Sequence, residues 1–359
     1  MAMTQSALHH ATLLSQYAQD WRPPNEGYYV VGDLFPIVPV AKEFDDYARF
    51  NASSWRQTAN SVVGPTGDVS RVDFYRDSDG SYRAKPHALE GVVDHKERDS
   101  ADDVVQYERK KLDVTLVTLH NTLEVDGMRE ALTTANLGTS FETVAAAERF
   151  DSFGLDANPV LYIERKCRRI KRLTGRKVNR IVLDDLTWQA IKWHPTTQNF
   201  LGFPGGANPV GLQLLTPKIL EEKLEEIVEP GAFRITSFRT EAARPPIATG
   251  SEDLRSHIKA ALIMARVEDS PSQADWSAFK CFSWTGTRDP ITNQTLEGGD
   301  PKAPVGVYTY PMPWQGQRGS TAMKVICNRA YKVGRTESLF VALECVDSTD
   351  TALYGTELT

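Results

Sequence analysis

Residues of the kinds that carry catalysis occur in this sequence, but their spacing matches no known catalytic or metal-binding pattern. There is no Gly-rich phosphate loop ending in Lys-Ser/Thr, no Gly-x-Ser-x-Gly elbow, no His-Glu-x-x-His pair and no Cys-x-x-Cys. The histidines are scattered, and each is interpreted as a surface or hydrogen-bonded histidine: His9, His10, His87, His95, His120, His194 and His257. We therefore predict no catalytic residue, no cofactor and no metal site.

An acidic stretch resembles part of a calcium-binding loop but lacks its last ligand. Asp77, Asp79 and Gly80 match the Asp-x-Asp-Gly portion, whereas the glutamate needed six residues after the glycine is replaced by Pro86. The stretch is better read as a turn. It would join strands near 71–75 and 81–85 into a β-hairpin.

The strongest charge feature is a basic run that follows Glu164. It favours either a face that contacts phosphate or an acidic partner, or a helix face packed against an acidic segment of the same protein. No aromatic residues interleave the basic ones, which disfavours single-strand recognition, so ionic packing is the preferred interpretation. The candidate contact face is Arg165, Arg168, Arg169 and Arg172, and the acidic candidates are Glu221, Glu222, Glu225, Glu226 and Glu229.

The overall charge disfavours a globally basic nucleic-acid binder. The 359 residues include 47 acidic and 41 basic side chains, with a formal net charge of −6. We see no signal peptide and no apolar stretch long enough to span a membrane. The four cysteines are distant from one another and are expected to be reduced and buried: Cys167, Cys281, Cys327 and Cys345.

The elements that would position these residues mix helices and strands. An apolar stripe from Val105 to Leu123 predicts a long helix that starts near residue 101. Two outcomes are open at Gly127: the helix kinks or ends there, or residues Met128 to Ala135 continue it. A second helix is expected at 159–174, and the C-terminal third is expected to form half-buried antiparallel strands at 279–284, 305–310, 321–330 and 338–346. The fold class is α+β.

Residues 53–98 contain few apolar residues, although their pattern predicts a two-stranded ribbon. Such a ribbon is marginal in water by itself. It must therefore pack on its own domain or on a neighbouring chain.

The order of several segments resembles that of the major capsid proteins of tailed bacteriophages. The opening Tyr-Val-Val-Gly-Asp-Leu-Phe-Pro-Ile-Val-Pro-Val at 29–40 and Tyr-Ala-Arg-Phe at 47–50 are similar to the start of that family. Further similar stretches, which bring the covered share to about half of the chain, are 158–159, 174–175, 178–179, 181–183, 188, 190–192, 194–195 and 278–284. Asn158 departs from the family, which often has Asp there.

That resemblance implies the Hong Kong 97-like capsid fold. The expected parts are an N-terminal arm at 1–30, a first peripheral segment at 31–52, an extended loop at 53–98, a peripheral domain with the spine helix at 99–152, an axial domain at 153–300 and peripheral return strands at 301–359. The implied contacts between subunits involve the arm and loop residues Trp55, Phe74, Tyr75, Tyr82 and Leu89. Deleting 66–88 is expected to leave a folded protein that forms no shells. Lys85 and Lys96 lie on the loop, but no cross-linking chemistry is predicted.

The resemblance also implies a function without catalysis. Copies would assemble as pentamers and hexamers into an icosahedral head around double-stranded DNA, which is packaged without sequence-specific binding. The implied partners are a portal protein, a separate scaffolding protein and a decoration protein, with no membrane. The implied location is the virion, preceded by the host cytoplasm. Two alternatives remain open: a bacterial encapsulin-type nanocompartment shell, and an unrelated α+β enzyme without a recognisable motif.

Overall fold

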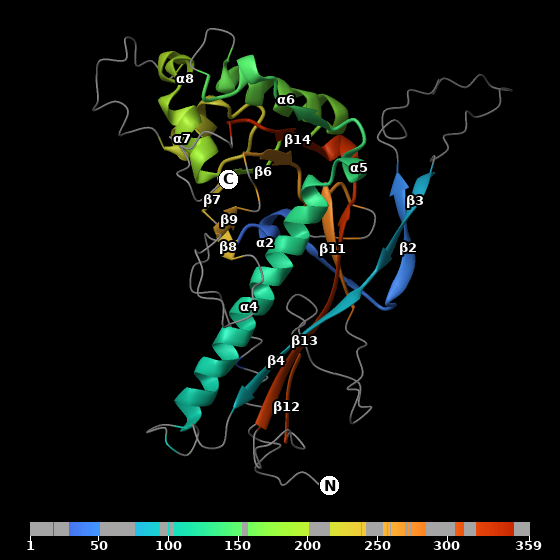
Figure 1. Cartoon of the computed structure of the whole chain (residues 1–359). Coiled ribbons are helices and arrows are strands. Elements are labelled where there is room, and N and C mark those ends of the chain that lie inside the picture. Colours follow the sequence, from blue (N-terminus) through green and yellow to red (C-terminus); the bar gives the residue numbers. More distant parts are fainter. Residues whose placement is uncertain are drawn as a thin grey trace, which may run out of the picture.

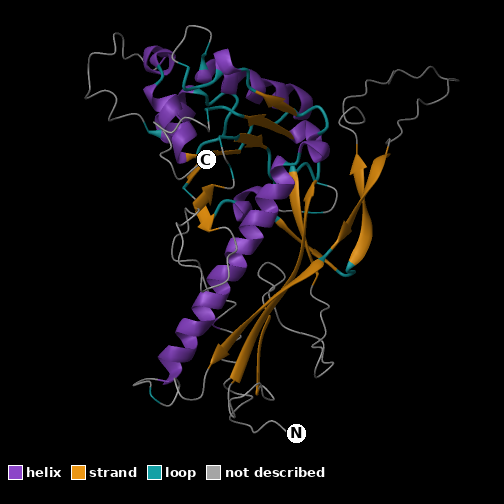
Figure 2. Ribbon diagram, viewed as in Figure 1, coloured by secondary structure: helices purple, strands orange, loops and turns teal. Residues whose placement is uncertain are grey.

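The computed structural model describes residues 17, 29–50, 76–93, 100, 104–152, 157–200, 216–237, 239–241, 254–256, 258, 260–269, 272, 275–284, 306–311 and 321–347. Figure 1 shows an elongated arrangement in which one long helix and a long sheet extend from a layered body of helices and strands. A two-stranded ribbon projects from the side of that sheet. The secondary structure is the mixture of helices and strands expected of the α+β class (Figure 2).

The long helix α4 (Val104–Leu132) has 29 residues and is therefore about 43 Å long at about 1.5 Å per residue. Its stripe of Leu112, Leu116, Leu119 and Leu123 is buried against the first sheet. Of the two outcomes left open at Gly127, the continuation is the one observed, because the helix runs on to Leu132.

Gly127 marks a close crossing of two helices. A Cβ atom at this position would lie 2.5 Å from Cγ1 of Val31, which belongs to the short helix α2 (Val31–Leu34). The glycine therefore permits close approach of two helices and does not break one.

The first sheet has the strand order β1-β11-β13-β12, with β4 on the other side of β13. β1 runs parallel to β11, and the other pairs are antiparallel. Pro39 lies in the edge strand β1, as expected for a residue that cannot donate to a ladder. The strands are β1 (Ile37–Val40), β4 (Lys85–Val93), β11 (Phe279–Trp284), β12 (Gly306–Pro311) and β13 (Thr321–Val333).

The projecting ribbon consists of β2 (Phe44–Phe50) and β3 (Arg76–Arg83), which pair antiparallel. The predicted hairpin between 71–75 and 81–85 is therefore wrong in its pairing. The expected turn at Asp77–Gly80 lies inside β3, and the segment that joins the two strands is 51–75. Polar turn-type residues are tolerated there because β3 has only one neighbouring strand in the described part of the chain.

The second sheet has the strand order β5-β14-β10-β6-β7 and carries helices of the layered body. Its last strand was expected to be half-buried, but Leu339 to Ala342 are all buried because β14 lies between β5 and β10. The strands are β5 (Phe141–Thr143), β6 (Arg180–Asp184), β7 (Phe233–Thr236), β10 (Leu262–Ala265) and β14 (Leu339–Leu343). The helices are α6 (Pro159–Thr174), α7 (Asp185–Trp193), α8 (Pro195–Phe200) and α10 (Pro217–Lys223).

The expected boundary at residue 300 does not separate the two sheets. β11 precedes it but pairs with β13 of the first sheet, and β14 follows it but pairs with β10 of the second. Hydrogen-bonded pairing between distant segments, which sequence order does not reveal, decides this arrangement. The main hydrophobic core lies under α4 and continues into both sheets, whereas a second core lies between the second sheet and α6.

Candidate interaction surfaces

The base of the ribbon is attached to its own chain by a small third core. The ring of Tyr82 stacks on Phe282 with 4.3 Å between centroids, and Tyr47 packs on the same ring at 5.0 Å. The Tyr47 hydroxyl donates to the carbonyl of Val333 over 3.2 Å. The ribbon is therefore supported where it leaves the sheet.

These contacts correct one of the expected intersubunit residues, Tyr82, and leave the role of Leu89 a prediction. Tyr82 is only 2% exposed and packs inside its own chain, so it cannot be a contact with another subunit. Leu89 is half-buried on β4 and packs against the main core. Trp55, Phe74 and Tyr75 lie outside the described residues, so their roles stay predictions.

Three large apolar side chains that the sequence analysis did not single out are exposed. Phe44 on β2 is 61% exposed, Trp193 at the end of α7 is 53% exposed and Phe200 at the end of α8 is 43% exposed. The ribbon and the α7–α8 end lie on different sides of the molecule (Figure 1). No sequence pattern distinguishes these residues from core residues, because exposure depends on what packs beside them.

The basic helix α6 begins and ends as its sequence predicts. Asn158 caps its N-terminus by accepting from the backbone N–H of Leu161 over 3.0 Å, and Gly175 ends it with a left-handed φ of 75°. An Asp at position 158 could cap in the same way, so the departure from the family pattern keeps the local structure.

The predicted basic face divides into two parts. Arg165, Arg168 and Arg172 lie on the exposed side of α6, where Arg168 pairs with Glu164 at 2.6 Å. Arg169 turns toward its own chain, donating to the carbonyl of Thr139 over 3.2 Å. Arg169 therefore contributes to packing within the chain.

The basic run lies beside the acidic segment, as expected. The contacts differ from the expected ion pairs. Lys171 and Lys177 reach that segment but donate to the backbone carbonyls of Glu226 and Glu225. The buried carboxylate of Glu221 instead accepts from two backbone N–H groups that follow it, and Glu229 pairs with Arg266.

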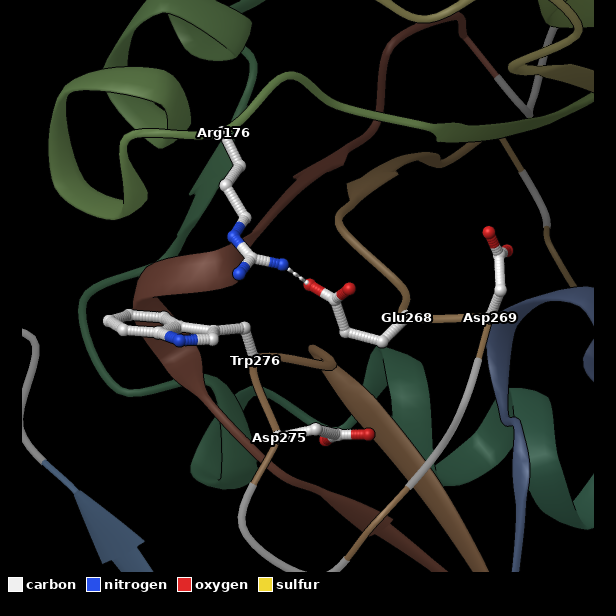
Figure 3. A pocket seen from close by; sticks show the side chains of 5 residues that line it. All are labelled: Arg176, Glu268, Asp269, Asp275 and Trp276. Atoms are coloured by element: carbon white, nitrogen blue, oxygen red, sulfur yellow. Dashed lines mark hydrogen bonds and ion pairs between the residues drawn. The ribbon is translucent and has the colours of Figure 1, made fainter.

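A polar pocket of about 370 Å³ lies beside the C-terminal end of α6, and Figure 3 shows its lining side chains. Glu268 pairs with Arg176 across it, and Arg266 approaches the same carboxylate at 3.5 Å. The buried Lys280 lies 2.8 Å from Asp275. The lining residues are Arg176, Glu268, Asp269, Asp275 and Trp276.

This pocket favours a structural role, because Glu268 and Asp275, two of its three carboxylates, are neutralised by cations of the same chain. Among the described residues no group of three or more His, Cys, Asp or Glu side chains could hold a metal ion. The four cysteines are free and buried, as expected, and burial raises the pKa of the Cys167 and Cys345 thiols. Neither of these two thiols is therefore activated as a nucleophile.

The ribbon contact supports a test of local packing at Gly80. A Cβ atom there would lie 2.4 Å from Cζ of Tyr47, on the paired strand. We expect Gly80→Ala to lower the free energy of unfolding by about 1–3 kcal/mol, because the rigid ring must move. Gly32→Ala is the control, since an added Cβ there meets no atom within 4 Å. Urea unfolding measures both, and equal stabilities would contradict the packing described.

Together the long helix, the projecting ribbon and the two sheets define a Hong Kong 97-type capsid fold, which confirms the fold implied by the sequence resemblance. No family model matches the chain, and no curated protein matches its sequence. In the parts of the chain that the structure describes, no helix combines the length and apolar character needed to cross a membrane.

The chain is similar to several solved structures. A phage-related protein from Bordetella bronchiseptica is similar with a TM-score of 0.66 at 17% identity, over 93% of this chain and 97% of that one. The capsid of cyanophage P-SCSP1u is similar with a TM-score of 0.52 at 8% identity, over 88% of each chain. The holo-encapsulin complex of Synechococcus elongatus is similar with a TM-score of 0.51 at 13% identity, over 98% of each chain. At these identities the similarity establishes the fold.

Proposed function

We propose that this chain is the major capsid protein of a tailed bacteriophage. Copies would assemble as pentamers and hexamers into an icosahedral head around double-stranded DNA. The observation that carries the proposal is the capsid fold over nearly the whole chain, which is shared with a cyanophage capsid. The work of such a protein is geometric, so no enzymatic activity is assigned to it.

The distribution of exposed apolar residues supports this proposal. Rings of five and six subunits need head-to-tail interfaces, in which two different patches of the same protein meet. Phe44 on the ribbon and Trp193 with Phe200 at the α7–α8 end supply apolar patches on different sides of the molecule. Aromatic side chains such as these are typical anchors of protein–protein interfaces.

The same proposal implies where the protein is located and which partners it has. Its location would be the virion, after a period in the host cytoplasm. A portal protein, a separate scaffolding protein and a decoration protein are the proposed partners besides further copies of the chain.

An encapsulin-type nanocompartment shell is the second candidate, because the similarity to an encapsulin has nearly the same TM-score as that to the cyanophage capsid. The contents of the particle separate the two. A phage head protein encloses DNA or nothing when produced alone, whereas an encapsulin encloses a protein cargo.

Electron microscopy of the purified protein tests the proposal. We expect closed shells at micromolar concentration, without a stoichiometric enzyme inside. A defined protein cargo would favour the encapsulin alternative. A protein that stays monomeric at every concentration and ionic strength would contradict both.

A further inference from the structure

An arginine interrupts the apolar face of the longest strand. Along β13, Met323, Val325 and Cys327 face the main core under α4, and Tyr331 and Val333 continue that face. Side chains of a strand alternate between its two faces. Arg329 therefore enters the same layer, between a buried thiol and a buried phenol.

Two histidines and two cysteines lie close enough to Arg329 to interact with its charge. His87 on β4 lies opposite Cys327, and Cys281 on β11 lies opposite Tyr331. Burial, and then the positive charge of Arg329, lower the pKa of His120 on α4 to about 4. The same charge opposes protonation of His87, whose pKa is lowered chiefly by burial. Both imidazoles are therefore neutral at pH 7.

No carboxylate of the described residues forms an ion pair with Arg329. Asp126 on α4 lies 3.8 Å from His87 and 3.5 Å from Arg129. A partly buried cation without a counter-charge is costly, and natural proteins pair or coordinate such groups.

Two hydrogen-bond donors in this layer also lack acceptors. Arg329 and Tyr331 interact with each other, but neither Nε of Arg329 nor the buried hydroxyl of Tyr331 has an acceptor of good hydrogen-bond geometry among the described residues. Tyr331 as a whole is only 9% exposed. A buried donor without an acceptor is destabilising. An acceptor that carries negative charge would satisfy both donors and balance the charge of Arg329.

We propose that Arg329 and Tyr331, with the neutral imidazoles of His87 and His120 beside them, bind a small oxyanion between α4 and the first sheet. An oxyanion offers several acceptor oxygens, and arginine is the side chain best suited to bind it. The bound anion would join the spine helix to the sheet. This role is independent of the contents of any shell.

Titration with inorganic phosphate tests the site. The protein is exchanged into phosphate-free buffer at pH 7, and its melting temperature is followed up to 10 mM phosphate at constant ionic strength. We expect a saturable rise, since a ligand that binds only the folded state stabilises it. Millimolar amounts avoid the general stabilisation that concentrated phosphate gives to most proteins.

Two variants and one control define the outcome. Arg329→Gln should weaken the apparent affinity at least tenfold, and Tyr331→Phe several-fold, whereas Arg168→Gln on the exposed face of α6 should leave it unchanged. Tyr331→Phe keeps the ring and the charge of Arg329, so without phosphate it should still fold. This variant keeps the test valid if Arg329→Gln does not fold.

The results that would overturn the proposal are equally definite. They are the absence of saturation in the wild type, or an affinity that neither Arg329→Gln nor Tyr331→Phe changes. Acetate is tested in parallel. Saturation by acetate without saturation by phosphate would show that the site takes a carboxylate, and would refute an oxyanion of the phosphate class.

Discussion

Replacing residues 51–75 by an Asn-Gly turn should yield a protein that folds but forms no shells. Phe50 and Arg76 lie directly opposite each other in the antiparallel ladder, so a two-residue turn can close the ribbon at that point. The core at its base is kept, because Tyr47 and Tyr82 still pack on Phe282. Only the part proposed to reach a neighbouring copy is lost.

This design replaces the deletion of 66–88 that the sequence suggested. That deletion would remove β3 with Tyr82 and the start of β4, which pairs with β13. It would therefore damage the fold as well as assembly, and a loss of particles would carry no information.

Sedimentation velocity and urea unfolding together measure the result. The shortened variant should unfold within about 1 kcal/mol of the wild-type subunit and should sediment only as small species. Substituting Trp193→Ser separately removes one exposed apolar group and should weaken assembly without changing stability. Normal shells from the shortened variant would show that the ribbon is not needed for contacts between copies.

The second large effect is expected at Glu124, a carboxylate buried in the joint between α2 and α4. It accepts from the backbone N–H of Val30 over 2.8 Å and from that of Val31 over 3.1 Å. Glu124→Ala would leave both buried donors without this acceptor. Because each such donor costs about 1–3 kcal/mol, we expect a total loss of about 2–6 kcal/mol.

The stability supplied by Glu124 should also depend on pH. Burial raises the pKa of Glu124 to about 7, and nearby Asp33 adds to this, while the two backbone hydrogen bonds oppose it. A pKa raised in the folded state favours folding when the group is protonated. The contribution is therefore complete below about pH 4.5 and is lost as the pH rises to about 7. The difference from the ordinary pKa corresponds to about 3 kcal/mol.

Glu124→Gln isolates the pH-dependent contribution of Glu124 to stability, because the amide keeps an acceptor oxygen but does not titrate. Between pH 5 and pH 8 the wild type should lose about 2–3 kcal/mol relative to this variant. Glu130→Gln, on the same helix but with its carboxylate 3.7 Å from Lys332, is the matched control and should not reproduce the change. Parallel pH profiles for the wild type and Glu124→Gln would refute the assignment.

Local patterns predicted the helices and many of the strands. The leucine stripe of α4 and the apolar face of the helix predicted at 159–174 each depend on residues a few positions apart, so the sequence alone indicates them. The order of similar segments also indicated the capsid fold.

Local sequence patterns did not predict which distant segments pair. Gly80 was taken for a turn because glycine in a polar stretch usually marks one, yet its role is to leave room for Tyr47 on β2. Tyr82 was taken for an exposed contact, since Phe282, the ring that buries it, lies 200 residues away in the sequence. The positions of Glu124 and Arg329 were missed for the same reason.

By itself, the sequence determined the local elements, the absence of a recognisable catalytic motif and the class of fold, because short-range periodicity and segment order express them directly. The tertiary structure alone decided which strands pair, which glycines permit close contacts and which charges become buried. Those properties depend on neighbours brought together by folding. A side chain's exposure and its acidity are set by those neighbours, and its residue type does not reveal them.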